Sequence, residues 1–322
     1  MFLVVDSLVA TVRRPILAKV SRKIACFPPL AGRGGFRQSL RVDNEDFSGA
    51  ALVVLGHGTE LNENSAAPVI QHAAELRRRR LFRDAREAFW KQEPQVKNVL
   101  AELSAKKPSR IFIAPLFISD GYFAGNVIPR DLGFDDGNRR LKNGDTEVVY
   151  CAPIGTHDAM TKVILSRATE VVKRFPFPRA PKDSETTLFI AGHGTEKNEN
   201  SRKPIERQVE LIRARKIFAD VQAIFLEESP RIPECYALTR TKHMVIVPFF
   251  ISDGLHTQED IPALLGEPKK NIVQRLASGQ PVWRNPTEQK GKLVWYSAAV
   301  GTEPGIADVI LERVREASVN LR

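Results

Sequence analysis

Short apolar runs alternate with longer amphipathic stretches from about residue 50 to the end of the chain. In the second part of the chain the apolar runs read TLFIAG, VQAIFLE, HMVIVPFF and KLVWYSAAVG. The stretches between and after them, at about 200–215, behind Pro230, at about 259–265 and behind Pro304, have the spacing of helices that bury one face. Because continuous apolar runs suit strands covered on both faces, the pattern predicts doubly wound α/β domains with small parallel sheets.

The same order of motifs occurs twice along the chain. VVLGHGTELNENS (53–65) precedes IAPLFISDGYFAGNVIP (113–129), and FIAGHGTEKNENS (189–201) precedes IVPFFISDGLHTQEDIP (246–262). The equivalent histidines, His57 and His193, are 136 residues apart (193 − 57). The chain is therefore predicted to contain a tandem duplication of a unit of about 135 residues.

The duplication and the composition along the chain predict four segments. They are a basic, disordered N-terminal extension (1–46), a first repeat (47–176), a Pro-rich charged linker (177–185) and a second repeat (186–322). The second repeat also carries an insertion of about 25 residues before its last strand. Since ligands of open parallel sheets bind at the carboxyl ends of the strands, we expect the functional residues there.

Composition indicates a protein without a membrane span. Of the 322 residues, 43% are hydrophobic and 27% are charged, and no apolar run reaches the length of about 18 residues that a spanning helix needs. The three cysteines, Cys26, Cys151 and Cys235, are far apart and odd in number, so neither a disulfide framework nor a cysteine metal site is indicated. A reducing, cytoplasmic location is expected, with organellar targeting by the basic N-terminus as the alternative.

The formal net charge of +10 raises the possibility of nucleic-acid binding. However, the basic residues are dispersed, and the densest runs, Arg77-Arg78-Arg79-Arg80 and Arg139-Arg140, lack interleaved aromatic residues. The pattern favours a polyanionic small substrate, or a solvated basic face, over nucleic acid.

His193 stands between Gly192 and Gly194 directly behind an apolar run. The flanking glycines allow a sharp turn and leave room for a bulky ligand, although a tight turn that feeds a helix would have the same pattern. Glu227 and His256 also follow strands of the same repeat. Two imidazoles and a carboxylate at neighbouring strand ends form a set that can bind a divalent metal and move protons.

The first repeat departs from this set. Lys91 aligns with Glu227 and Phe123 aligns with His256, so only His57 is retained. Because lysine and phenylalanine cannot replace a carboxylate and an imidazole as metal ligands, the second repeat is predicted to carry the chemistry. The first repeat is predicted to be structural or to help bind the substrate.

The Gly-His-Gly-Thr loop, the strand that ends in Phe-Leu-Glu, and PFFISDGLHTQEDIP resemble the sirohydrochlorin chelatases of the CbiX type. The resemblance covers roughly residues 50–320 as two family units, and in the first unit Phe123 and Val127 break the pattern. Asp253 also departs from it, because a small or apolar residue is expected at this position. The resemblance implies a lyase that inserts Co²⁺ or Fe²⁺ into sirohydrochlorin without a nucleotide cofactor, in cobalamin or siroheme biosynthesis.

Metallation removes two pyrrole protons while a cation is delivered. Under the resemblance, His193 and His256 would bind the metal or take protons, and Glu227 would offset charge. Such a ligand set accepts Co²⁺, Fe²⁺ and Ni²⁺ alike. Basic side chains can pair with the carboxylates of the tetrapyrrole. The candidate substrate-binding residues are His57, Gly192, Gly194, Arg202, Lys203 and Arg207.

Two other functions fit parts of the pattern. A non-catalytic metal- or tetrapyrrole-carrying protein would explain the incomplete first repeat, but it would have little need for a proton acceptor. A histidine phosphatase would carry arginine directly before the loop histidine, where Gly56 and Gly192 stand. The expected partner is sirohydrochlorin, and the protein is expected to be a monomer or a homodimer because two fused repeats could replace a dimer of single units.

Overall fold

The computed structural model describes residues 46–58, 65–135, 137–196 and 199–319. Nearly all of the predicted N-terminal extension, residues 1–46, lies outside the described residues. Both predicted repeats belong to one unit of the chain, which begins at Glu45. No helix in the described part of the chain is long and apolar enough to cross a membrane.

The sheet of the first repeat has five strands, of which four are parallel. In spatial order they are β2 (Asp84–Phe89), β1 (Ala50–Gly56), β3 (Arg110–Pro115), β5 (Thr146–Tyr150) and β4 (Arg140–Asn143). All seven residues of β1 are buried, as a central strand covered on both faces requires. The edge strand β4 runs antiparallel to β5.

The sheet of the second repeat has the same strand order. It contains β7 (Asp220–Phe225), β6 (Thr186–Gly192), β8 (His243–Pro248), β10 (Lys292–Tyr296) and β9 (Thr287–Gln289). The strand β9 is the antiparallel edge. The α/β fold of both repeats was predicted, as were the four parallel strands of the second repeat, but the antiparallel edge strands were not. The strands RLKN and TEQ are short and polar, so no apolar run marks them.

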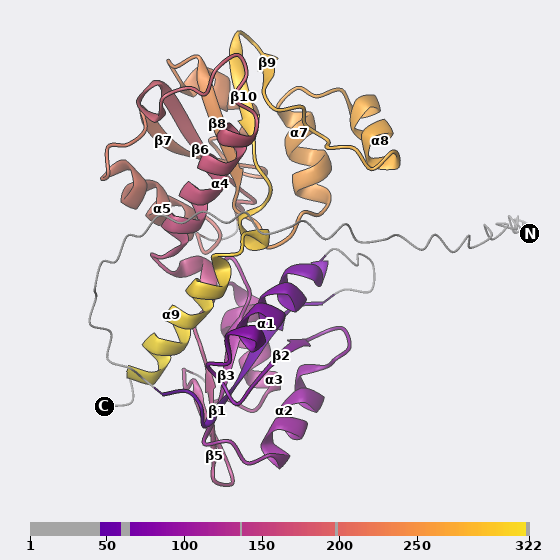
Figure 1. The fold of residues 1–322 in the computed structure, drawn as a ribbon, viewed down its shortest axis with the longest axis vertical. Coiled ribbons are helices and arrows are strands. Elements are labelled where there is room, and N and C mark those ends of the chain that lie inside the picture. Colours follow the sequence, from indigo (N-terminus) through magenta and orange to yellow (C-terminus); the bar gives the residue numbers. More distant parts are fainter. Residues whose placement is uncertain (1–45, 59–64, 136, 197–198, 320–322) are drawn as a thin grey trace, which may run out of the picture. The chain divides into compact units, whose positions relative to one another are not determined.

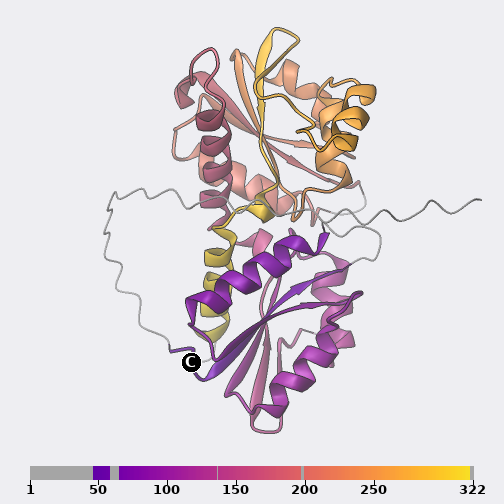
Figure 2. The same ribbon diagram turned by 45° about the vertical axis from the view of Figure 1, so that its right-hand side comes forward.

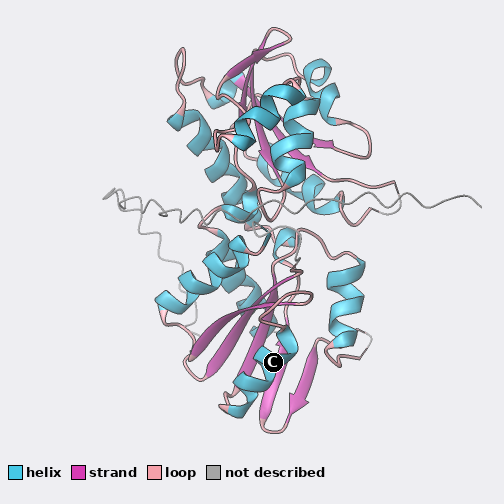
Figure 3. Cartoon of the chain, turned by 90° about the vertical axis from the view of Figure 1, so that its right-hand side faces the viewer, coloured by secondary structure: helices cyan, strands magenta, loops and turns pink. Residues whose placement is uncertain are grey.

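Helices cover both faces of each sheet (Figure 3). The first repeat contains α1 (Ala67–Arg79), α2 (Val96–Ala105), α3 (Ile128–Asp131) and α4 (Met160–Arg174), and the second contains α5 (Lys203–Arg213), α6 (Cys235–Leu238), α7 (Ile261–Leu264), α8 (Lys269–Ala277) and α9 (Ile306–Val319). The predicted insertion contains α8 and β9. Pro68 and Pro204 lie in the first turns of α1 and α5, where the missing N–H is not needed.

The last helix of each repeat packs on the sheet of the other repeat. The helix α4 contacts β8 and β10, whereas α9 contacts β3 and α1. Figures 1 and 2 show α9, in yellow, beside the indigo and violet elements of the first repeat. Apolar residues from both repeats consequently form one continuous core cluster. Each sheet is therefore covered partly by a helix that belongs to the other sequence repeat.

We call α4 and α9 the exchanged helices, because each packs on the sheet of the other repeat. One arginine of each exchanged helix forms hydrogen bonds with that other repeat. Arg167 of α4 donates hydrogen bonds to the carbonyl of Ala299 (3.2 Å) and to the hydroxyl of Thr302 (2.7 Å). The Thr302 hydroxyl belongs to the short helix η7 (Val300–Thr302), which follows β10. Arg167 is buried and also pairs with Glu170 of its own helix at 2.8 Å. A buried guanidinium needs such partners, because unpaired buried charge is costly.

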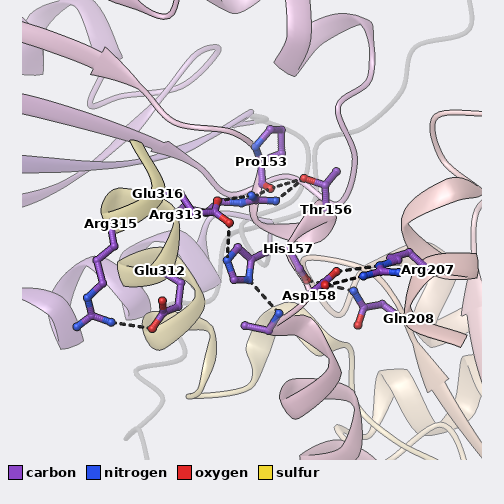
Figure 4. Close-up of polar contacts among 11 residues, drawn as sticks. Pro153, Thr156, His157, Asp158, Arg207, Gln208, Glu312, Arg313, Arg315 and Glu316 are labelled. Carbon is purple, nitrogen blue, oxygen red and sulfur yellow. Dashed lines mark hydrogen bonds and ion pairs between the residues drawn. The ribbon is translucent and has the colours of Figure 1, made fainter. Parts of the chain in front are cut away.

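The equivalent contact holds α9 on the first repeat (Figure 4). Arg313 donates to the carbonyl of Pro153 (3.0 Å) and to the hydroxyl of Thr156, and it pairs with Glu316 at 2.6 Å. Thr156 ends the short helix η3 (Ile154–Thr156) behind β5. In both contacts an arginine bonds a backbone carbonyl and a threonine hydroxyl at equivalent positions. The exchange of helices is therefore repeated in the same way in the two duplicated units.

The carboxyl-terminal edges of the two sheets meet around η3 and η7. The side chain of Gln208 donates to the carbonyl of His157 (3.1 Å), and the equivalent residue of the first repeat, His72, bonds the carbonyl of Gly301 at 2.7 Å. A Cβ atom at Gly301 would lie 2.1 Å from the carbonyl oxygen of Ile251, so only glycine fits there.

Two histidines of this junction are held in their neutral form. Burial lowers the pKa of His72, whose Nε2–H donates to Gly301. Burial, followed by the nearby Arg313 guanidinium, lowers the pKa of His157. His157 accepts the Ala159 N–H on Nδ1, which leaves the Nε2–H to bond Glu316 at 3.0 Å. Protonation of Nδ1 would break the contact with Ala159.

We predict that Arg313→Met lowers the free energy of unfolding by about 2–3 kcal/mol, because it removes the buried hydrogen bonds from the guanidinium to the Pro153 carbonyl and the Thr156 hydroxyl. The matched control is Arg315→Met on the same helix, where only the partly exposed pair with Glu312 is lost. Urea denaturation measures both variants. Equal losses in the two variants would contradict the role given to Arg313.

We also predict that acid weakens the folded state through His72 and His157. Their pKa values are lower in the folded than in the unfolded chain, so their contribution is complete above the usual pKa of 6.5 and is lost as the pH falls below it. His72→Gln, which copies Gln208, should flatten the decline in unfolding free energy between about pH 7 and pH 5. An unchanged slope would exclude His72 as a source of the decline.

Candidate metal-binding site

The loop that carries His193 begins where the buried strand β6 ends at Gly192. Gly194 has φ +69°, and a Cβ atom there would lie 2.7 Å from Glu228; at Gly192 it would lie 2.0 Å from Ile205. Gly194 is therefore required by its backbone conformation and by the packing beneath the loop, whereas a side chain at Gly192 would require the Ile205 side chain to move. The predicted part of both glycines in substrate binding remains a prediction.

His193 has a fixed ring orientation. Its Nδ1 lies 2.8 Å from the carbonyl oxygen of Gly194 and 3.7 Å from Oε2 of Glu227, which follows β7. A carbonyl and a carboxylate only accept hydrogen bonds, so Nδ1 carries the proton and Nε2 of the neutral ring keeps its lone pair. His193 therefore offers Nε2 as a ligand.

His256 opens the π-helical turn η6 (His256–Asp260), which precedes α7. Its Nδ1–H donates to Oδ2 of Asp260 at 2.7 Å, so Nε2 of this ring is also free to bind a ligand. A carboxylate behind an imidazole fixes the ring and raises its basicity, as in the outer shell of many metal sites. The equivalent turn η2 (Phe123–Val127) is also π-helical, so this backbone shape belongs to the fold.

The two imidazoles lie together, with ring centroids 5.0 Å apart and planes at 83°. Their side chains are 41% and 42% exposed, and the Glu227 side chain is 58% exposed, so solvent and ligands can reach all three. Among the described residues, no three His, Cys, Asp or Glu side chains are already arranged to hold a metal. The site thus presents two imidazole nitrogens that form no hydrogen bond within the described part of the chain, and a nearby exposed carboxylate.

Glu228 supports the loop from below, and the sequence analysis did not select it. Its buried carboxylate accepts the backbone N–H of Thr195 at 3.1 Å and pairs with Arg202 at 3.3 Å. Glu228 directly follows Glu227, so the pair of adjacent acidic residues was the sequence signal that could have identified it. Arg202 also pairs with Glu206 at 3.1 Å, so its guanidinium is engaged within the repeat.

The other two basic candidates differ in how firmly they are held. Arg207 forms two hydrogen bonds with the carboxylate of Asp158, at 3.0 and 2.8 Å, next to the junction of the repeats (Figure 4). Lys203 pairs with Glu199 at 2.8 Å, and both side chains are largely exposed. An exposed pair of this kind contributes little free energy, so Lys203 can exchange Glu199 for another carboxylate.

Asp253 has a structural reason to be acidic. It accepts the backbone N–H of Ala299 at 2.8 Å and lies 3.4 Å from the hydroxyl of Thr302. It therefore holds the loop behind β10 to which Arg167 binds. In the first repeat Pro153 replaces Ala299 and has no N–H, and the equivalent Asp120 instead lies 3.8 Å from Arg139.

Aromatic rings surround the loop histidine of the first repeat, and one of them, Phe123, stands where the second repeat has His256. The Nδ1 of His57 lies 2.8 Å from the carbonyl of Gly58, as in the second repeat. However, the rings of Trp90 and Phe123 lie 5.3 and 5.7 Å from the His57 ring, measured between centroids. The ammonium group of Lys91 lies 3.9 Å from the centroid of Trp90. The described residues thus bring no second imidazole or carboxylate to His57.

These features define a class of α/β protein with two tandem repeats and a histidine pair at the strand ends of the second. The CbiX family profile matches residues 51–171 and 187–317. The chain belongs to the CbiX family.

Known proteins similar to the chain agree with this assignment. The chain is 41% identical over 282 residues to a probable sirohydrochlorin cobaltochelatase of Halobacterium salinarum, covering 83% of this chain and 91% of the relative. SirB from Bacillus subtilis, solved with Fe³⁺, has a TM-score of 0.60 at 17% identity and covers 84% of this chain and 96% of its own. A multi-domain Deinococcus radiodurans protein with structural similarity to chelatases has a TM-score of 0.64 at 24% identity; the match covers 82% of this chain and 54% of that protein. The two structural matches establish the fold.

We predict that Asp260→Ala weakens Co²⁺ binding about 10- to 100-fold, because the His256 ring loses the partner that fixes it. The matched control is Glu259→Ala, one residue away, for which no partner is found among the described residues. Isothermal titration with Co²⁺ alone compares the two variants. A loss in Glu259→Ala as large as in Asp260→Ala would contradict the role of Asp260.

Proposed function

We propose that the protein is a sirohydrochlorin chelatase, which inserts Co²⁺ or Fe²⁺ into sirohydrochlorin without nucleotide hydrolysis, in cobalamin or siroheme biosynthesis. The observation that carries the proposal is the contact between His193 and His256, each with Nδ1 bonded to an acceptor and Nε2 free. Membership of the CbiX family and the similarity to the Halobacterium cobaltochelatase support the same activity.

The metal is a substrate, so its binding site must also release it. Two imidazole nitrogens hold a divalent cation while other positions remain open to the pyrrole nitrogens. A complete and rigid ligand set would retain the ion, whereas the exposed Glu227 can approach and withdraw. Cobalt, iron and nickel ions all accept such ligands, and the proposal does not choose between them.

Proton removal can be coupled to metal transfer by the same residues. Insertion of a divalent ion into the macrocycle releases two N–H protons. When the metal leaves Nε2 of a histidine, that nitrogen regains a lone pair and can take a proton. Glu227 lies 3.7 Å from Nδ1 of His193, where it offsets the charge of the imidazolium that forms.

Substrate carboxylates require cationic partners near the histidine pair. Lys203 suits this role best among the three basic candidates, because its only ion-pair partner in the described chain is the exposed Glu199. Arg202 and Arg207 would first have to leave Glu228 and Asp158. We therefore propose Lys203 as a substrate-binding residue, with His57 as a contact from the first repeat.

We predict that His193→Ala and His256→Ala each abolish the enzyme-dependent rate of metallation, while His57→Ala retains most of it. The absorption change of sirohydrochlorin on mixing with Co²⁺ or Fe²⁺ and purified protein measures the rate. Full activity of both alanine variants would refute the assignment. Binding of sirohydrochlorin and metal by the wild-type protein without acceleration of metallation would instead identify a carrier.

A further inference from the structure

Three aromatic residues, two exposed and one half-buried, form a cluster at the strand ends of the first repeat. We call Trp90, Tyr122 and Phe123 the aromatic surface. The Phe123 centroid lies 5.6 Å from Trp90 and 5.9 Å from Tyr122. Tyr122 is 70% exposed and Phe123 is 48% exposed. Large apolar rings grouped on a surface are costly to hydrate and mark binding sites.

The aromatic surface is rigid at its base. The indole Nε1–H of Trp90 donates to Oδ2 of Asp131 at 3.1 Å, and Lys97 bonds the other carboxylate oxygen at 2.9 Å. The bond from Lys97 holds the pKa of Asp131 below its usual range, so this acceptor stays charged. A ring fixed before binding loses little entropy when a ligand stacks on the surface.

The positive charge of Lys91 beside the aromatic surface disfavours a metal ion and favours a ligand with carboxylate groups. Lys91 stands where Glu227 stands in the second repeat, and its ammonium group lies 3.9 Å from the Trp90 centroid. Positive charge repels a divalent cation and attracts a carboxylate. Among the described residues, the ring of Phe123 stands at the position of His256, and the ring of Trp90, the residue before Lys91, also contacts His57. The surface thus suits a flat, apolar ring with acidic substituents.

We propose that the aromatic surface binds the macrocycle of the metal-free tetrapyrrole substrate, while His193 and His256 hold the metal. This inference rests on the proposed function and adds a substrate site in the first repeat. The aromatic surface lies at the carboxyl-terminal edge of its sheet, and that edge meets the equivalent edge of the second sheet through His72 and Gln208. One chain therefore divides binding of the ring and binding of the metal between its two repeats.

The test is a titration of the full chain with metal-free sirohydrochlorin in the absence of metal. Replacing both Trp90 and Phe123 by alanine should weaken binding about tenfold or more, because two stacking rings are lost. Tyr122→Ala, at an exposed position that leaves the core intact, should weaken it about threefold. The matched control is Phe177→Ala, which removes a ring that is 72% exposed in the linker, away from the cluster; its affinity should be that of the wild type.

Two further measurements separate the possible failures. Co²⁺ binding without tetrapyrrole should be unchanged in the double variant, and the KM for sirohydrochlorin should rise while kcat is retained. Wild-type affinity in both the double variant and Tyr122→Ala would overturn the inference, as would an equal loss in Phe177→Ala. Failure of the proposed function is a different result, in which the wild-type protein does not accelerate metallation at all.

Discussion

The exchange of the last helix between the repeats is the constraint on which the rest of the structure depends. Arg167 and Arg313 each carry a buried guanidinium across to the other repeat and bind a carbonyl and a threonine hydroxyl there. Since each helix completes the apolar core of the other repeat, neither sheet is fully covered by its own repeat. The exchange also brings the two carboxyl-terminal edges together, and these edges carry the histidine pair and the aromatic surface.

The two repeats share a backbone fold but differ in the side chains at their strand ends. This difference allows one repeat to bind the metal and the other to bind the macrocycle. Both repeats have a Gly-His-Gly loop and a π-helical turn at equivalent places, so the backbone alone does not make a metal site. The second repeat adds Asp260 behind His256 and places Glu227 beside His193. The first repeat has aromatic rings and an ammonium group instead. The first repeat thus lacks the metal-ligating side chains and has the aromatic surface in their place.

Sequence reasoning predicted the parts of this account that depend on local pattern. Apolar runs marked the four parallel strands of the second repeat, and the duplicated loops located the histidines of both repeats. The polar edge strands β4 and β9 were missed because a short polar strand leaves no apolar run. The helix exchange was missed because the amphipathic pattern of α4 and α9 indicates only that one face of each helix is buried. It does not indicate which of the two sheets covers that face. Glu228 was missed because its role depends on burial beneath the loop, which spacing does not reveal.

The central claim is that only the second repeat binds the metal, through His193 and His256. Anomalous scattering from crystals of the protein soaked in Co²⁺ tests it most directly, because the signal locates the ion without reference to activity. The account predicts one anomalous peak per chain, within bonding distance of Nε2 of both histidines, and no peak at His57. A peak at His57, or an absence of signal between His193 and His256, would contradict it.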